Sequence, residues 1–279
     1  GSALAQVYNH IIMPLANRRD KQTQVIWGIK DFEHRFNRSP EGMWLAETAV
    51  DCETLDIMSD NGIAFTILAP HQAHRVRKIG AAEWSSVSGQ RVDPKRPYLC
   101  RLPSGRSITI FFYDGPISLD VSFRELLSNG VRFANRLIDV FDDDPEPQLV
   151  SIATDGETYG HHHRYGEMAL TYCLHHISSH TLAHITVFGE YLEKFPPAYE
   201  VEIYENTSWS CSHGVERWKS DCGCSIGQQS SWNQKWRGPL RNALDRLRNR
   251  LISIYEDKMS PCVRDPWSAR NEYIDIILS

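Results

Sequence analysis

The fold and the first candidate site are both decided by residues 148–161, which read QLVSIATDGETYGH. The first six of them, Gln148 to Ala153, have the apolar, β-branched composition of a short buried strand. Asp155 follows where this strand should end, and Glu157, Gly160 and His161 come after it. The ends of the strands build the active site of an α/β barrel, so Asp155 is a candidate acid, base, nucleophile or metal ligand.

Strand-like and helix-like segments alternate along the rest of the chain. Further strand patterns occupy residues 63–68, 108–113, 183–187 and 201–204. Helical patterns occupy residues 24–36, 122–141, 165–176 and 240–254. Such alternation predicts a mostly parallel sheet with right-handed crossovers, either a barrel or an open doubly wound sheet. No glycine-rich phosphate loop follows a strand, which argues against a nucleotide-binding fold.

The composition excludes several classes of partner. The net charge of the 279 residues is −5, which gives no reason to expect nucleic acid as a partner. No stretch approaches the ~20 apolar residues that a membrane span needs. An odd number of cysteines, seven, fits a reducing cytoplasm better than a secreted disulfide scaffold.

A second carboxylate, Glu47, ends the short apolar run from Met43 to Leu45 in the same way as Asp155 ends its run. Cleavage of a glycosidic bond needs two carboxylates on opposite sides of the bond, and a spacing of about 5–5.5 Å leads to retention of configuration. The pair Glu47 and Asp155 is therefore a candidate catalytic pair. The alternative is that both are surface or helix-capping acids.

Histidine and cysteine clusters offer two candidate metal sites. His161, His162 and His163 follow Asp155, but consecutive side chains do not converge on one ion, and a loop that binds sugar hydroxyls is an equal alternative. A plausible tetrahedral zinc set comes later in the chain and consists of Cys211, His213, Cys222 and Cys224. Such a zinc ion would be structural, because four protein ligands leave no open position. Packed thiols or a disulfide are the alternatives.

Taken together, these motifs resemble glycoside hydrolase family 57, and more narrowly its bacterial branch labelled domain of unknown function 3536. Residues 42–47 (GMWLAE) resemble the strand whose Glu is the nucleophile, which implies this role for Glu47. Residues 155–161 (DGETYGH) resemble the segment whose Asp is the acid/base, which implies that role for Asp155. The resemblance further implies a set of substrate-binding residues, namely His10, Trp44, Asp114, Glu157, His161, Trp209, His213 and Trp218. For His213 this role is an alternative to binding metal.

The resemblance implies a (β/α)7-type barrel with a C-terminal helical extension. Residues 3–205 would form the catalytic barrel, and residues 206–279 a Trp- and Cys-rich loop and helical segment packed on it. The His-Gln-Pro motif of the family's first strand is absent, since the only His-Gln is His71-Gln72. We therefore expect a barrel that lacks its first strand and has an open seam, which bears on its activity.

The function implied is that of a cytoplasmic retaining enzyme that hydrolyses or transfers an α-linked glycan. Its partner would be an oligo- or polysaccharide, and catalysis would require no cofactor. One alternative is a metal-dependent polysaccharide deacetylase, in which Asp155 and one of His161 to His163 would bind the metal. Another is a non-catalytic glycan-binding barrel, against which the presence of both carboxylates weighs.

Overall fold

The computed structural model describes residues 1–224 and 232–279, and this part of the chain divides into two compact units. The first unit comprises residues 1–2, 67–101 and 109–203. The second comprises residues 3–66, 102–108 and 204–279. The predicted division into residues 3–205 and 206–279 stays a prediction.

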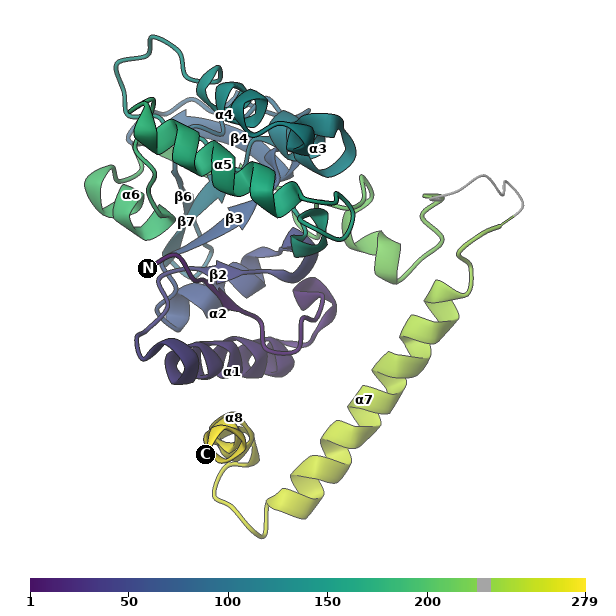
Figure 1. Ribbon diagram of the computed structural model, residues 1–279. Coiled ribbons are helices and arrows are strands. Elements are labelled where there is room, and N and C mark those ends of the chain that lie inside the picture. The colour runs from purple at the N-terminus through teal and green to yellow at the C-terminus, as the bar shows by residue number, and fades with distance from the viewer. Residues whose placement is uncertain (225–231) are drawn as a thin grey trace. The chain divides into compact units, whose positions relative to one another are not determined.

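A six-stranded sheet forms the centre of the first unit (Figure 1). Its strand order is β3-β7-β6-β8-β4-β5. The strands are β3 (Phe65–Leu68), β4 (Ala73–Lys78), β5 (Ser85–Ser86), β6 (Tyr98–Arg101), β7 (Ser107–Phe112) and β8 (Tyr199–Ile203). Strands β3 and β7 begin in the second unit and end in the first. The strands predicted near residues 63–68, 108–113 and 201–204 are thus confirmed.

The sheet is mixed, which differs from the predicted mostly parallel arrangement. Strand β8 pairs parallel to β6 and antiparallel to β4. Cross-strand charge explains the antiparallel register, because Arg75 lies opposite Glu202 and Arg77 opposite Glu200. The guanidinium of Arg75 donates to both carboxylate oxygens of Glu202, at 2.7 and 2.9 Å.

Helices α3 (Gly115–Phe123), α4 (Gly130–Ile138) and α5 (Gly166–Ser179) share one hydrophobic core, and α4 lies beside α5 (Figure 1). Phe133 and Cys173 are fully buried in it. The single helix predicted over residues 122–141 is wrong. A 3-10 helix (Glu125–Ser128) interrupts it, and the Asn129 side chain then caps α4 by accepting from the Arg132 main chain. Helix α6 (Phe188–Lys194) precedes β8.

The strand predicted over residues 148–153 does not form as a regular strand. Individual main-chain hydrogen bonds hold the segment in place. The Leu149 N–H donates to the Lys95 carbonyl, and the Ser151 carbonyl accepts from the Asp114 N–H. Pro147, just before it, has no N–H to extend a ladder. The strand predicted over 183–187 is likewise not a regular strand.

The second unit carries a short parallel pair, β1 (Ala5–Gln6) and β2 (Met43–Trp44), with Ala5 opposite Met43. Helix α1 (Arg18–Phe36) connects them, capped by the Asn17 side chain, which accepts from the Asp20 main chain. Helix α2 (Cys52–Asp60) follows β2 and is capped in the same way by Asp51. The buried ammonium group of Lys21 donates to Asp51 at 2.6 Å and to Glu53 at 2.9 Å.

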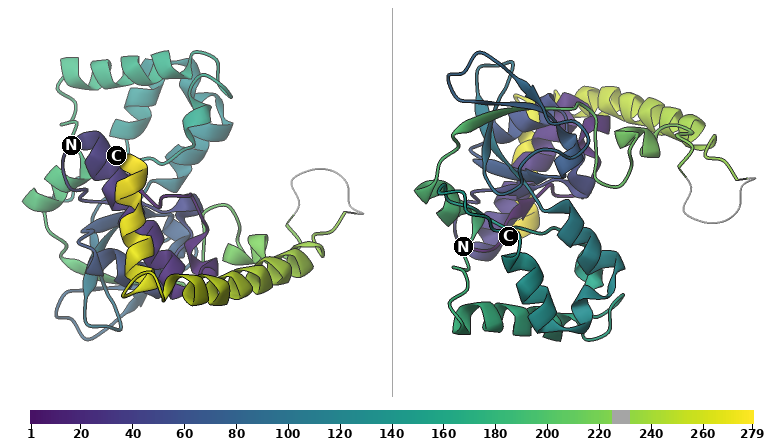
Figure 2. Two further views of the ribbon diagram at one scale, coloured as in Figure 1. Left: turned by 90° about the horizontal axis from the view of Figure 1, so that it is seen from below. Right: turned by 90° about the horizontal axis from the view of Figure 1, so that it is seen from above.

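Two C-terminal helices, α7 (Arg237–Met259) and α8 (Pro266–Leu278), belong to the second unit as well. Helix α8 packs across α1 (Figures 1 and 2), and the Trp27 indole donates to the main chain of Arg270 and Asn271. The apolar stripe of α7 predicted from the sequence is about half exposed, for example 48% at Leu240 and 53% at Leu251. Among the described residues, no helix has the length and hydropathy that crossing a membrane requires.

Candidate functional site

Glu47 and His10 follow the carboxyl ends of the two parallel strands of the second unit. Strand β1 ends at Gln6 and leads to His10, while β2 ends at Trp44 and leads to Glu47. Because the strands are parallel, the two loops leave from the same edge. His10 is exposed and has a left-handed backbone, with φ of 53°. The structure therefore places Glu47 after the end of a strand, as the sequence predicted, and places His10 in the loop after the neighbouring strand.

The backbone at Glu47 is strained. Within the 3-10 helix Ala46–Thr48, Glu47 has φ 58° and the buried Thr48 has φ 49°. Such left-handed conformations cost about 1–3 kcal/mol each and persist only where the surroundings fix them. Here the Thr48 main chain donates to Leu45 at 2.9 Å and the Ala49 main chain to Ala46 at 3.0 Å. The turn thus presents the Glu47 side chain in a fixed direction.

Trp209 holds Glu47 through two hydrogen bonds. Its indole Nε1 donates to Oε2 of Glu47 at 3.0 Å, and its main-chain N donates to the Glu47 carbonyl, also at 3.0 Å. The Trp209 ring also meets the edge of Trp44, with centroids 5.2 Å apart. The structure therefore brings three of the predicted site residues together, namely Trp44, Glu47 and Trp209.

A tight loop brings Trp209 to this place. Val50 pairs with Thr207 in an isolated antiparallel bridge, and the Val215 main chain donates to Asn206 at 2.9 Å. Gly214 makes the loop possible, because its φ is +60° and a Cβ there would lie 2.1 Å from the Asn206 carbonyl oxygen. Only glycine fits this backbone without displacing it.

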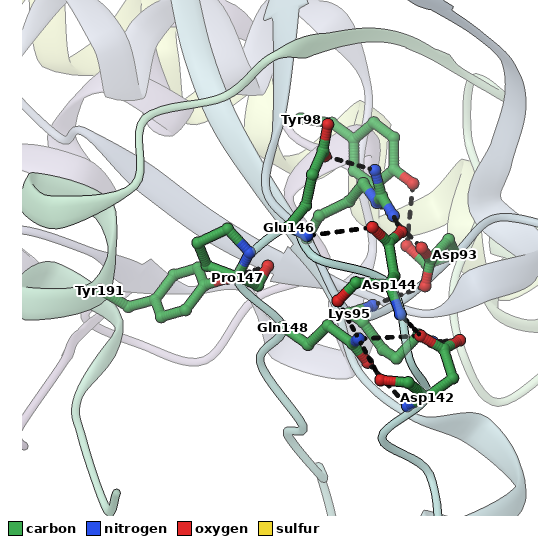
Figure 3. A network of polar contacts seen from close by, with 10 residues as sticks. Asp93, Lys95, Tyr98, Asp142, Asp144, Glu146, Pro147, Gln148 and Tyr191 are labelled. Atoms are coloured by element: carbon green, nitrogen blue, oxygen red, sulfur yellow. Dashed lines mark hydrogen bonds and ion pairs between the residues drawn. The ribbon is translucent and has the colours of Figure 1, made fainter.

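Asp155 lies in the first unit, at the end of a segment that polar contacts fix. Figure 3 shows the network at its start, where the Gln148 amide donates to the Asp142 carboxylate at 2.8 Å and Glu146 pairs with the guanidinium of Arg96 at 3.0 Å. Burial alone would lower the pKa of Arg96, but the carboxylates of Asp93 and Asp144 raise it above its usual range. Further along, the Ala153 main chain donates to the Ser118 hydroxyl at 3.1 Å.

The turn after this segment presents the predicted polar residues to solvent. Asp155 precedes the 3-10 helix Gly156–Thr158, and Asp155, Glu157 and His161 are all exposed. His163 is different, since its Nε2 lies 2.9 Å from the Ser122 carbonyl. His163 therefore holds the turn on the end of α3, while His161 remains exposed in it.

Asp114 has a structural partner that the sequence did not predict. It is 8% exposed, and its Oδ1 accepts from the Ile117 main chain at 2.8 Å, which caps α3. One carboxylate oxygen therefore serves the helix. A role of Asp114 in binding substrate stays a prediction, as does that of Glu157.

The structure brings together the four side chains of the candidate zinc set, all of which lie in the second unit. The ligand atoms of Cys211, His213, Cys222 and Cys224 all lie within 4.8 Å of one another. The Nδ1 of His213 lies 3.2 Å from Sγ of Cys224. Burial raises the pKa of the Cys211 thiol to about 11. Among the described residues, 1–224 and 232–279, these four side chains form a group whose ligand atoms are close enough to hold one metal ion. His161, His162 and His163 form no such group.

Trp218 lines a cavity of 740 Å³ within the second unit. It shares the lining with Trp27 of α1 and with Trp236 and Leu240 near the start of α7. The Arg241 guanidinium closes one side by donating to the Leu15 carbonyl at 3.2 Å. An aromatic cavity of this kind suits an apolar face of a ligand, and the role of Trp218 in binding substrate stays a prediction.

The sequence did not predict the contact between Trp209 and Glu47, which are 162 residues apart in the chain. Trp209 was expected to touch sugar, and nothing in a single sequence indicates that its indole would hold a carboxylate. Glu47 and Asp155 belong to different units.

Two models of known protein families match the chain. Its residues 2–204 match the model of glycosyl hydrolase family 57, so the chain belongs to this family. Residues 232–279 match a second family model, described as a domain of unknown function (DUF3536). Both confirm the resemblance seen in the sequence. No curated protein matches the chain.

Solved structures share the fold. An exo-type maltose-forming amylase from Pyrococcus sp. ST04 is 14% identical, with a TM-score of 0.76 over 97% of this chain and 48% of its own. A family 57 branching enzyme from Pyrococcus horikoshii is 18% identical, with a TM-score of 0.63 over 78% of this chain and 49% of its own. A 4-alpha-glucanotransferase from Thermococcus litoralis is 20% identical, with a TM-score of 0.56 over 74% of this chain and 31% of its own. The α/β fold is that of family 57, and the chain spans about half the length or less of these proteins.

Proposed function

We propose that this chain carries the catalytic residues of a retaining enzyme that hydrolyses or transfers α-glucan chains, with Glu47 as nucleophile and Asp155 as general acid/base. The observation that carries the proposal is the hold of Trp209 on Glu47 in a chain that belongs to glycosyl hydrolase family 57. A carboxylate on a strained turn, fixed by an indole and a main-chain contact, has the preorganisation that a nucleophile needs.

The first step forms a covalent intermediate. The Trp209 indole occupies Oε2 of Glu47, which leaves Oε1 as the oxygen that attacks the anomeric carbon. The Asp155 carboxylic acid gives its proton to the leaving glycosidic oxygen. The C–O bond of the glycoside breaks and an ester between the sugar and Glu47 forms.

The second step reverses these roles. The Asp155 carboxylate takes a proton from a water molecule or from a sugar hydroxyl, whose oxygen attacks the same anomeric carbon. The ester to Glu47 breaks, and its carboxylate is restored. Two inversions give net retention, and the nature of the second acceptor decides between hydrolysis and transfer.

The aromatic residues around Glu47 support a sugar as substrate. The partly buried rings of Trp44 and Trp209 lie edge to face, 5.2 Å between centroids, beside the carboxylate. Such rings pack against the apolar C–H face of a sugar, while exposed polar groups such as His10 bind hydroxyls. An α-glucan is supported by the similar structures, which are described as an amylase, a branching enzyme and a glucanotransferase.

The test uses maltoheptaose and amylose with wild-type protein, Glu47→Gln and Asp155→Asn, and follows product anomers by NMR. Both variants should fold, with unchanged circular dichroism, and lose turnover, while the first-formed product of the wild type is the α-anomer. Glu41→Gln and Asp143→Asn replace exposed acids and serve as matched controls that keep activity. Full activity of either catalytic variant, or a β-anomer as the first product, contradicts the proposal.

A further inference from the structure

We propose that Cys211, His213, Cys222 and Cys224 bind one structural zinc ion, and that this ion fixes the loop that holds Trp209 on Glu47. Zinc binding itself does not depend on the proposed function. Its effect on turnover does, because it acts through Trp209 and Glu47.

The ligand atoms have the spacing of a tetrahedral zinc site. Bonds of about 2.3 Å to sulfur and about 2.0–2.1 Å to nitrogen place ligand atoms at tetrahedral edges of about 3.5–3.8 Å. The Sγ atoms of Cys211 and Cys224 are 3.5 Å apart, and Nδ1 of His213 lies 3.7 Å from Sγ of Cys211. All four ligand atoms lie within 4.8 Å of one another, Cys222 included.

The local backbone supports this arrangement. The His213 main chain donates to Sγ of Cys211 at 3.4 Å, a contact that favours the thiolate over the thiol. Gly223, with φ of +79°, makes the turn between Cys222 and Cys224 that lets both thiols reach one point. The short Cys-x-Cys spacing, which departs from the common zinc spacing, is accommodated in this way.

The charge of the site is balanced in part by an arginine. Binding of Zn²⁺ releases three protons from the three thiols, so the complex of three thiolates and one neutral imidazole carries a charge of −1. The guanidinium of Arg237 lies 3.7 Å from Sγ of Cys222 and offsets this charge. Four protein ligands leave no open position, so the ion is structural and not catalytic.

The site connects directly to the candidate nucleophile. Cys211 pairs with Ser208 in an isolated bridge, and Trp209 lies in the turn between them. Fixing Cys211 and His213 to one ion therefore fixes the main chain whose N–H donates to the Glu47 carbonyl. Loss of the ion should loosen the hold of Trp209 on Glu47.

The experiment measures zinc in protein purified under reducing conditions without chelator and after removal of any affinity tag. Mass spectrometry of the metal content should give about one zinc per chain in the wild type, and less than about one tenth of that in Cys224→Ser and Cys211→Ser. His213→Cys should keep the zinc, because a thiolate replaces the imidazole, and it covers the case in which the serine variants fail to fold. Replacing zinc by Co²⁺ should give the visible bands of tetrahedral cobalt with thiolate ligands.

Two controls separate this site from adventitious binding. Cys262→Ser removes an exposed thiol, and His162→Ala removes an exposed imidazole from the other histidine cluster, and both should retain the zinc. Wild-type protein without zinc or cobalt overturns the proposal, as does zinc retained in Cys224→Ser or a disulfide between Cys211 and Cys224 under the same conditions. Full zinc with no turnover would leave the metal site standing and count against the proposed function alone.

Discussion

Replacing Trp209 by phenylalanine tests its hold on Glu47, the proposed nucleophile. The variant keeps an aromatic ring against Trp44 and keeps the main-chain contact to the Glu47 carbonyl, but it removes the indole N–H that donates to Oε2 at 3.0 Å. The change therefore isolates one hydrogen bond to a carboxylate.

The size of the effect follows from that bond. A hydrogen bond to a charged group contributes about 1.5–3 kcal/mol, and partial exposure of Glu47 places its contribution to stability at the lower end, at about 1.5 kcal/mol. A carboxylate that is free to turn attacks less often, and a loss of 1.4–2.8 kcal/mol of transition-state stabilisation corresponds to about 10- to 100-fold in kcat. KM should change less, because an aromatic ring remains where Trp209 is proposed to contact the sugar.

The assay is a double-mutant cycle with Glu47→Gln, followed by urea unfolding, together with kcat and KM of the single Trp209→Phe variant on maltoheptaose. The two substitutions should be coupled by about 1 kcal/mol, because the neutral amide accepts a weaker hydrogen bond than the carboxylate. Additive effects on stability combined with an unchanged kcat in Trp209→Phe would refute the reasoning.

Four further outcomes are expected. Asp155→Asn should lower kcat by about 10²–10⁴-fold, the usual contribution of a general acid/base, as measured on maltoheptaose, whereas loss of less than about threefold would count against its role. Lys21→Met should destabilise the protein by about 3 kcal/mol in urea unfolding, because it leaves the Asp51 carboxylate without its buried ammonium partner, and a change near zero would show that this pair is not needed. Gly214→Ala should cost at least about 1–2 kcal/mol from its left-handed backbone alone and should lower both zinc content and kcat, while a neutral result would mean that the loop adapts. The Arg101 guanidinium, more than Arg77, holds the pKa of Glu200 below its usual 4.5. The ionised Glu200 carboxylate therefore stabilises the fold above about pH 4.5, and this stabilisation is lost as the pH falls through the lowered pKa of the folded state. Glu200→Gln should lower Tm at pH 7 and have little effect near pH 2, and an equal effect at both pH values would contradict this.

The sequence predicted the elements whose signal is local. The β-branched residues of β7 predicted a strand, and the spacing of Leu240 to Ile254 predicted α7. The break before α4 was missed although Ser128, Asn129 and Gly130 form a turn signal, because the apolar residues on both sides continue a helical pattern. The antiparallel pairing of β4 and β8 was missed because the complementary charges of Arg75 and Glu202 are 127 residues apart.

The candidate site shows the same division. The motif of neighbouring residues around Glu47 was enough to name it a candidate site residue. The short sequence distance between Cys211 and Cys224 likewise predicted their contact. The indole that holds the Glu47 carboxylate is positioned by the loop closed at Gly214, and Glu47 itself has a left-handed backbone. No local sequence pattern indicates either feature. The contact of His163 with Ser122 could not be predicted from the sequence either. His161, His162 and His163 form a uniform run, in which nothing distinguishes His163 from the other two.

The most direct test of the central claim is to trap the covalent intermediate. Wild-type protein is incubated with 5-fluoro-α-D-glucosyl fluoride, digested, and analysed by mass spectrometry of the peptides. We expect one fluoroglucosyl group, attached to Glu47, and no label in Glu47→Gln. A label on another carboxylate, or an active enzyme that gives an inverted product and no labelled peptide, would contradict the claim that Glu47 is the nucleophile of a retaining glycosidase.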